Sequence, residues 1–285
     1  MKVRSEGTND KFIESLRFHK DSHFDYTYFC PVTTNAIISV KDLKKNYGEF
    51  QAVKGISFDV YQGEIFGLLG PNGAGKTTTL EIIETLREKS SGTVHLAGMD
   101  ISKNGNAIKQ MIGVQLQAAG YYPSLTLVEL IKLFSGLYDI ETDAMKMLRS
   151  VGLEDKAKAK YKELSGGQKQ RFSIATTLIN KPSIIFLDEP TTGLDPQARR
   201  NLWDLIRTIR DNGATVVITT HYMDEAEQLC DRVAVMEAGK IIALDTPDAL
   251  IDTLIASGFE RKKEVKKANL EDVFLSLTGQ EWRDE

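Results

Sequence analysis

Short apolar runs and stretches of helical periodicity alternate along most of the chain. Residues 37–40, 56–60 and 64–69 are short apolar segments separated by turn residues, which predicts strands. From Lys76 to about Leu86, apolar residues recur three and four positions apart, so we expect a helix there. Regular structure is therefore expected from Ile37 onward.

The second half of the chain shows the same alternation. Residues 120–165 carry helical periodicity, whereas residues 182–187 and 215–219 are almost uniformly apolar. Uniformly apolar strands are typical of a sheet that is covered on both faces. Alternating helices and buried strands predict an α/β fold with a largely parallel sheet.

Composition places the chain among ordinary globular proteins. Hydrophobic residues make up 41% and charged residues 27%, which excludes collagen-like, low-complexity and wholly disordered chains. The net charge of −4 argues against a general nucleic-acid coat. Cys30 and Cys230 form no CxxC pair, which favours a reducing cytosolic compartment. No apolar stretch reaches about 18 residues, so we expect any membrane role to come through a partner.

Residues 1–36 differ in character from the rest of the chain. Six aromatic residues fall in this segment, too many for a solvated tail: Phe12, Phe18, Phe24, Tyr26, Tyr28 and Phe29. We interpret it as an extension that packs on the body or as residues added by a misplaced start. A short docking segment for a partner is the alternative.

A glycine-rich loop between a predicted strand and a predicted helix carries the first chemical signal. It fits G-x-x-x-x-G-K-[ST] completely, with Thr78 directly after it: Gly70, Pro71, Asn72, Gly73, Ala74, Gly75, Lys76 and Thr77. Its N–H groups would surround phosphate oxygens at a helix N-terminus. Lys76 would reach the β- and γ-phosphates, and Thr77 would bind Mg²⁺. The alternative is a chance glycine loop.

Two acidic residues follow the apolar run at 182–187. The predicted strand delivers Asp188 to its C-terminal end, where ligands bind in open α/β sheets, and there Asp188 would hold Mg²⁺ through water. Glu189 lies where the strand ends and can turn toward the γ-phosphate as the general base for an attacking water. The alternative is a strand end with two solvated carboxylates.

A second glycine segment opens another predicted helix. Residues 164–168 read LSGGQ, with Ser165 as a possible N-cap and the N–H groups of Gly166 and Gly167 unobstructed ahead of Gln168. One chain then has two phosphate-binding surfaces, one without a lysine. Two chains that share each nucleotide head to tail would explain this; a simple capped helix start is the alternative.

Four motifs occur in order at 70–77, 164–168, 187–190 and 193–196. Together they resemble the nucleotide-binding subunit of an ABC transporter over about residues 37–245. The resemblance implies a P-loop NTPase fold with a mostly parallel core sheet, an antiparallel β subdomain and a helical signature subdomain at about 118–180. A short helical tail would occupy 246–285. It also implies two such domains around two ATP molecules with Mg²⁺, and an integral membrane permease as partner.

The resemblance assigns further roles. Tyr47 would stack on adenine, with a turn aromatic as the alternative, and Asp195 would reach across the dimer. Gln117 resembles the glutamine that joins Mg²⁺ and water to the transporter contact, although Gln115 lies close enough to compete. His221 resembles the histidine that contacts the γ-phosphate. Glu189, His221, Gln117 and Lys76 form the predicted catalytic set.

Later segments resemble one type within the family. Residues 221–227, 231–237, 244–250 and 268–279 are similar to the drug-exporter (daunorubicin-resistance) type, whose subunits pair with a separate permease. This implies a location at the cytoplasmic face of the membrane, a homodimer as the simplest closed arrangement, and no nucleic-acid partner.

Two competing functions and three unassigned segments remain to be considered. An ABC ATPase that acts on ribosomes or DNA and a P-loop kinase or GTPase are the competing functions. The extension at 1–36 and the short segment 250–270 depart from the type. The basic cluster 261–267 would be a solvated linker or a contact with an anionic membrane surface.

Overall fold

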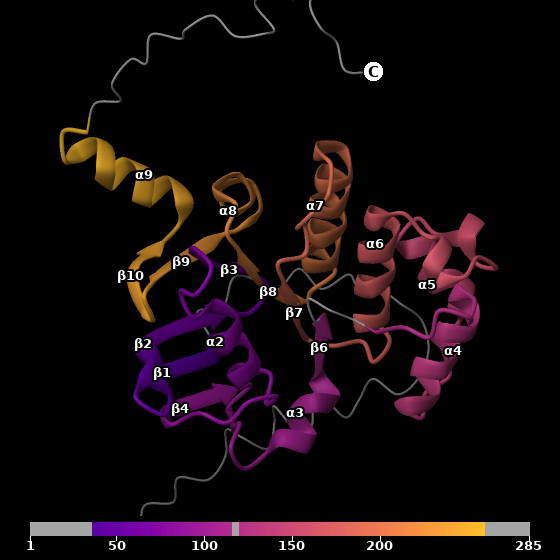
Figure 1. Cartoon of the computed structure of the whole chain (residues 1–285), viewed down its shortest axis with the longest axis horizontal. Coiled ribbons are helices and arrows are strands. Elements are labelled where there is room, and N and C mark those ends of the chain that lie inside the picture. Colours follow the sequence, from indigo (N-terminus) through magenta and orange to yellow (C-terminus); the bar gives the residue numbers. More distant parts are fainter. Residues whose placement is uncertain (1–35, 116–119, 260–285) are drawn as a thin grey trace, which may run out of the picture. The chain divides into compact units, whose positions relative to one another are not determined.

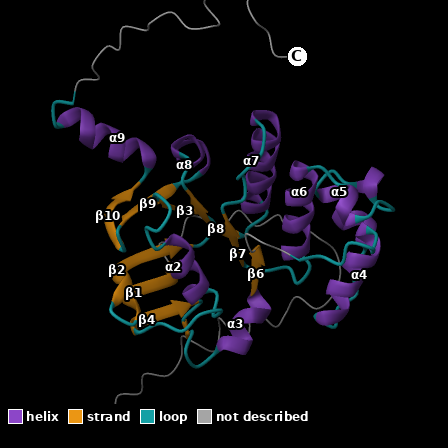
Figure 2. Cartoon of the chain, viewed as in Figure 1, coloured by secondary structure: helices purple, strands orange, loops and turns teal. Residues whose placement is uncertain are grey.

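Two sheets organise the protein in a computed structural model that describes residues 36–115 and 120–259 (Figures 1 and 2). The larger sheet has the order β10-β9-β3-β8-β7-β6, and its inner pairs are parallel. Its strands are β3 (Ile65–Leu69), β6 (Ile112–Gln115), β7 (Ile184–Asp188), β8 (Thr215–Thr220), β9 (Arg232–Glu237) and β10 (Lys240–Asp245). Every residue of β3, β7 and β8 is buried, as expected for strands covered on both faces.

The smaller sheet is antiparallel, with the order β2-β1-β4-β5. It contains β1 (Ala36–Tyr47), β2 (Phe50–Tyr61), β4 (Ser91–Leu96) and β5 (Met99–Asp100). β1 and β2 are much longer than the predicted runs at 37–40 and 56–60, because polar residues continue the pairing through several register shifts. Phe58 stacks on Phe66 with ring centroids 5.3 Å apart, which joins the two sheets in one core.

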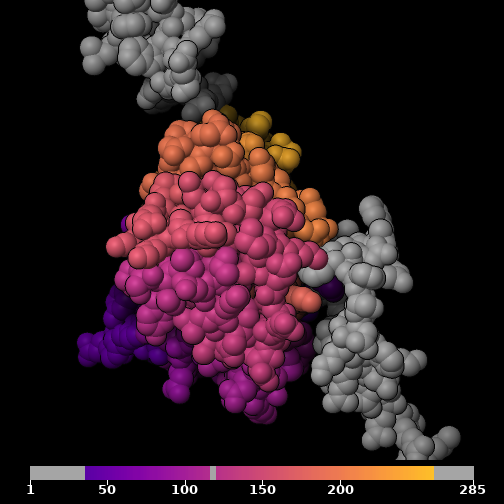
Figure 3. Space-filling model, turned by 90° about the vertical axis from the view of Figure 1, so that its right-hand side faces the viewer, coloured from indigo at the N-terminus to yellow at the C-terminus, as the bar shows by residue number. Residues whose placement is uncertain are grey.

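A helical part of the chain forms a second core beside the sheets. It comprises α4 (Leu127–Leu137), α5 (Ala144–Ser150), the 3₁₀ turns Glu154–Lys156 and Tyr161–Glu163, and α6 (Gly166–Thr177). Leu130, Leu148 and Phe172 are fully buried among these helices. Figure 3 views the molecule from this side, where the pink and magenta atoms of this part form one continuous surface.

The remaining helices are α2 (Lys76–Ile83), α3 (Gly105–Met111), α7 (Pro196–Asp211), α8 (Met223–Leu229) and α9 (Pro247–Ala256). The predicted helix from Lys76 to Leu86 was too long, because α2 ends at Ile83 and Thr85 has a left-handed backbone with φ of 64°. α9 has no buried residue. Within the described residues, no helix has the length and apolar character needed to cross a membrane.

Several predicted features lie outside the described residues. They are the aromatic segment before Ala36, with Cys30, the glutamine at position 117, and the basic cluster 261–267. Their assignments stay predictions. The same holds for the proposed boundaries at 36, 245 and about 118–180.

Candidate functional site

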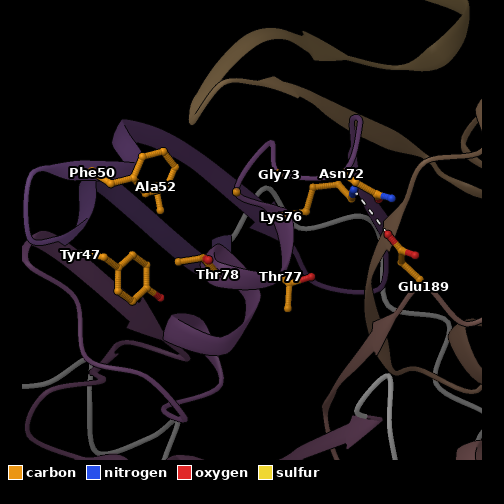
Figure 4. A pocket seen from close by; sticks show the side chains of 10 residues that line it. Tyr47, Phe50, Ala52, Asn72, Gly73, Lys76, Thr77, Thr78 and Glu189 are labelled. Atoms are coloured by element: carbon orange, nitrogen blue, oxygen red, sulfur yellow. Dashed lines mark ion pairs between the residues drawn. The ribbon is translucent and has the colours of Figure 1, made fainter.

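A pocket of about 460 Å³ opens beside the loop between β3 and α2. Tyr47 and Phe50 border one end of it, and Lys76 and Glu189 border the other (Figure 4). Tyr47 and Phe50 face each other across the hairpin of β1 and β2, and both side chains are exposed. The pocket therefore runs from an aromatic end to a charged end.

The loop at 70–77 makes a tight turn under the charged end. Gly75 has φ of 98° and serves as the N-cap of α2, where no side chain caps the helix. A Cβ atom at Gly70 would fall 2.2 Å from the carbonyl oxygen of Met236, so only glycine fits there. The first N–H groups of α2 are thus left for a ligand, which suits an anion.

Lys76 is buried at the charged end of the pocket and contacts both the glycine loop and Glu189. Its side chain is only 4% exposed, and Nζ donates to the carbonyl oxygens of Gly70 at 2.8 Å and Pro71 at 3.2 Å. The same Nζ lies 3.5 Å from Oε1 of Glu189, the ion pair drawn in Figure 4. A single ammonium group therefore connects the glycine loop to the end of β7.

Asp188 lies at the C-terminal end of β7, as predicted, and receives two hydroxyl donors. Thr77 Oγ1 lies 3.3 Å from both carboxylate oxygens, and Thr219 Oγ1 donates to Oδ1. Burial raises the pKa of Asp188, and the hydrogen bonds from Thr219 and Thr77 oppose that shift. A hydroxyl and a carboxylate side by side are the oxygen ligands that Mg²⁺ takes together with water. Thr77 and Asp188 supply the protein oxygens of such a site, and Mg²⁺ usually keeps several of its waters.

Glu189 turns out of the strand into the pocket. Its backbone is left-handed with φ of 46°, and its N–H donates to Thr219 Oγ1 at 3.0 Å. The carboxylate is 10% exposed; Oε2 accepts from Thr192 Oγ1 at 3.3 Å and lies 3.3 Å from His221 Nδ1. The turn is costly for a residue with a Cβ, and it places the carboxylate between Lys76 and His221.

The second glycine segment is built differently and does not line this pocket. Ser165 is the N-cap of α6: its Oγ accepts from Gln168 N at 3.3 Å, and Gln168 Oε1 accepts from Ser165 N at 3.0 Å. Asp195 is likewise the N-cap of α7, where it accepts from Ala198 N at 2.8 Å. Gly166, Ser165 and Asp195 are exposed to solvent.

Gln115, the competing glutamine, has a partner of its own. Its Nε2 donates to Gln170 Oε1 on α6 at 2.9 Å, and the residue is buried. Its side chain is therefore engaged between β6 and α6. Gln117 lies outside the described residues, so its assignment over Gln115 stays a prediction.

Sequence reasoning missed four residues that line the pocket or contact its carboxylates: Phe50, Ala52, Thr192 and Thr219. The signal for Thr219 was available, because it lies one residue before the end of an apolar strand and pairs in register with Asp188. Phe50 follows the same logic, because it directly opposes Tyr47 in the hairpin. Nothing in the local pattern around Thr192 pointed to Glu189.

Comparison with known proteins shows the family to which the chain belongs. A family model described as "ABC transporter" matches residues 53–192. The chain is 38% identical over 301 residues to the Nod factor export ATP-binding protein I of Burkholderia orbicola (strain AU 1054), covering 87% of this chain and 99% of the relative. It is 40% identical over 223 residues to the linearmycin resistance ATP-binding protein LnrL of Bacillus subtilis (strain 168), covering 76% and 72%.

Solved structures agree on the fold. The chain matches the ADP conformation of the ATP-binding cassette MJ1267 with a TM-score of 0.70 at 25% identity, covering 78% of this chain and 96% of that one. It matches the dimeric post-hydrolysis state of the cassette MJ0796, bound to ADP and Pi, with a TM-score of 0.66 at 28% identity, covering 74% and 98%. The predicted cassette fold is confirmed. The chain belongs to the ABC transporter family and is an ATP-binding ATPase subunit of it.

Proposed function

We propose that the chain drives an exporter of the daunorubicin-resistance type as a head-to-tail dimer joined to a separate membrane permease. One relative supports the direction of transport by its name, which states Nod factor export, and another is named for linearmycin resistance. The permease would place the subunit at the cytoplasmic face of the membrane. The cargo would be selected by the permease.

ATP would lie along the pocket from its aromatic to its charged end. Tyr47 would stack on adenine, while the glycine loop with Lys76 and Thr78 would surround the phosphates. Thr77, Asp188 and Gln117 would hold Mg²⁺, which would neutralise charge on the β- and γ-phosphates when bound.

The second glycine segment, residues 164–168, would complete the nucleotide site of the partner chain rather than the site of the chain that carries it. Ser165, Gly166, Gly167 and Gln168 do not line the pocket, nor does Asp195. A cassette similar in fold, MJ0796, is a dimer with ADP and Pi bound. Two copies of this chain related by a twofold axis would bring each signature to the other's γ-phosphate.

The position of Glu189 is the single observation that carries the hydrolytic part. The attacking water would give its proton to the Glu189 carboxylate as its oxygen bonds to the γ-phosphorus and the bond to the β-phosphate oxygen breaks. His221 lies on the other side of this carboxylate, 3.3 Å away, where it would contact the γ-phosphate.

The first test is Glu189→Gln. We expect ATP hydrolysis, measured by phosphate release, to fall about 10²–10⁴-fold while ATP binding is kept, because the amide cannot accept the proton. Glu227→Gln is the matched control, since Glu227 is exposed on α8 outside the pocket. Undiminished hydrolysis in Glu189→Gln would remove Glu189 from this role.

The same variant tests the partner. Tagged Glu189→Gln with ATP should recover an integral membrane protein from detergent-solubilised membranes of the source cell. Recovery with ribosomal proteins or nucleic acid from the soluble fraction alone would overturn the permease partnership and favour a role on ribosomes or DNA.

A further inference from the structure

One side of α7 is joined to the segment that follows β8 by a contact at nearly every helical turn. The contacts are Arg199 to Asp224 at 3.0 Å, Trp203 Nε1 to Glu225 at 3.0 Å, Arg207 to the carbonyl oxygen of Gln228 at 2.7 Å, and Arg210 to Asp231 at 3.1 Å. α7 begins immediately after Asp195, and the joined segment begins immediately after His221. Asp195 and His221 therefore directly precede two segments that contact each other along their length.

The contact nearest the site is a stack rather than an ion pair alone. The Arg199 guanidinium carbon lies 4.6 Å from the centre of the Tyr222 ring, and that ring lies 4.1 Å from the His221 ring at an angle of 38°. Arg199 Nε is buried and makes no hydrogen bond within the described part of the chain. The guanidinium group of Arg199 thus packs on the Tyr222 ring as a cation–π contact.

The imidazole of His221 has little else to fix its orientation. Nδ1 is buried 3.3 Å from Glu189 Oε2, yet the pair lacks hydrogen-bond geometry, and Nδ1 has no other hydrogen-bond partner among the described residues. A ring without a directional bond is held by the surfaces that pack on it. Tyr222 provides such a surface, and the Arg199 guanidinium in turn packs on the Tyr222 ring.

We propose that Tyr222 and Arg199 are positioning residues for His221. Their stack sets the angle at which the imidazole faces the Glu189 carboxylate, and it ties that angle to α7, whose first turn is capped by Asp195. A shift of the Asp195 end of α7 would then turn His221. The inference rests on the proposed contact between His221 and the γ-phosphate.

Conservative and disruptive variants separate positioning from folding. We expect Tyr222→Ala and Arg199→Ala each to lower kcat about tenfold with KM within about twofold, because the stack orients a group needed for the reaction and not for nucleotide binding. Tyr222→Phe should keep wild-type kcat because it retains the ring. Arg207→Ala is the matched control: it removes the contact two turns further along α7, so Tm should fall while kcat stays unchanged.

A double-mutant cycle with His221→Ala decides the case. If Tyr222 acts through His221, adding Tyr222→Ala to His221→Ala should lower kcat no further. Wild-type kcat in Tyr222→Ala, a loss in Tyr222→Phe equal to that in Tyr222→Ala, or additive losses in the cycle would each overturn the inference while leaving the role of His221 intact. An unchanged kcat in His221→Ala alone would instead overturn the proposed role of His221 itself.

Discussion

The two glycine segments that open α2 and α6 look alike in sequence, but the structure completes them differently. Gly75 caps α2 without a side-chain hydrogen bond, and buried Lys76 lies directly behind the loop. Ser165 and Gln168 cap α6 reciprocally, and no lysine is buried there. The first N–H groups of α2 are left for a ligand, whereas one of those in α6 is already used. This difference supports the proposal that the first segment binds phosphate by itself and that the second adds to a site on the partner.

Within this comparison, the largest expected effect comes from removing the buried lysine that only the first segment has. Lys76→Met should lower kcat by about 10²–10³-fold, because it deletes the buried donor at the charged end of the pocket. Lys76→Arg is the control for charge without the lysine's shape, and circular dichroism at matched temperature checks folding. Phosphate release within about twofold of wild type in Lys76→Met would show that the glycine loop alone suffices and would erase the difference between the segments.

The end of α2 carries a buried carboxylate whose effect on stability depends on pH. Glu84 follows α2 and is buried, and its Oε1 has no hydrogen-bond partner among the described residues. Burial, with Asp188 and Glu81 nearby, raises its pKa to about 8. Between the usual pKa of 4.5 and about 8, the unfolded chain releases this proton while the folded chain keeps it. The free energy of unfolding therefore falls as pH rises through that window and levels off above it.

Glu84→Gln removes the titration. Without nucleotide or Mg²⁺, we expect the variant to gain stability relative to wild type on going from pH 5 to pH 8.5, by a few kcal/mol at most at ~1.36 kcal/mol per pKa unit. Denaturant unfolding at both pH values measures it. Glu88→Gln, which changes an exposed carboxylate four residues further along the chain, is the control. An equal difference between variant and wild type at both pH values would contradict the shift.

The smallest effect tests the second segment. Gly166→Asp should leave ATP affinity of the monomer unchanged and weaken ATP-dependent dimerisation of the Glu189→Gln protein at least about tenfold, because a carboxylate at the start of α6 repels phosphate. A Cβ at Gly166 meets only Leu194 at 3.9 Å, so the fold tolerates it. Gly166→Asn supplies the same shape without charge. Light scattering with ATP measures dimerisation. If the Asp and Asn variants dimerise equally, this segment does not contact the phosphate.

Local motifs predicted the pocket because its key residues are close in sequence or lie at strand ends. The loop around Lys76 is recognised directly from its spacing, and burial of β7 placed Asp188 at a sheet edge. The length of β1 was not predictable from apolar residues, since Lys41, Asp42 and Lys44 interrupt the run while the backbone continues to pair.

Contacts between distant elements escaped the sequence for a different reason. Arg199 and Tyr222 come from a helix and a loop. Tyr222 lies in the segment 221–227 that resembles the exporter type, but nothing in that pattern pairs it with Arg199. The pKa of Glu84 depends on how deeply the side chain is buried and on the nearby Asp188. A glutamate one residue after a helix in the sequence indicates neither. Such effects arise from tertiary packing, so only the fold shows them.

Met236, which comes close to Gly70, lies near the end of β9, and the turn after β9 is bonded to the loop at 70–77. Gly239 N–H donates to the carbonyl oxygen of Ala74 at 3.0 Å, and the Gly239 carbonyl oxygen accepts from Lys54 N–H at 2.8 Å. One peptide segment is thus bonded to the loop and to β2 at once. The Gly239 amide proton is consequently an internal reporter: its hydrogen-exchange rate would register how firmly the loop is ordered, from a position that does not line the pocket.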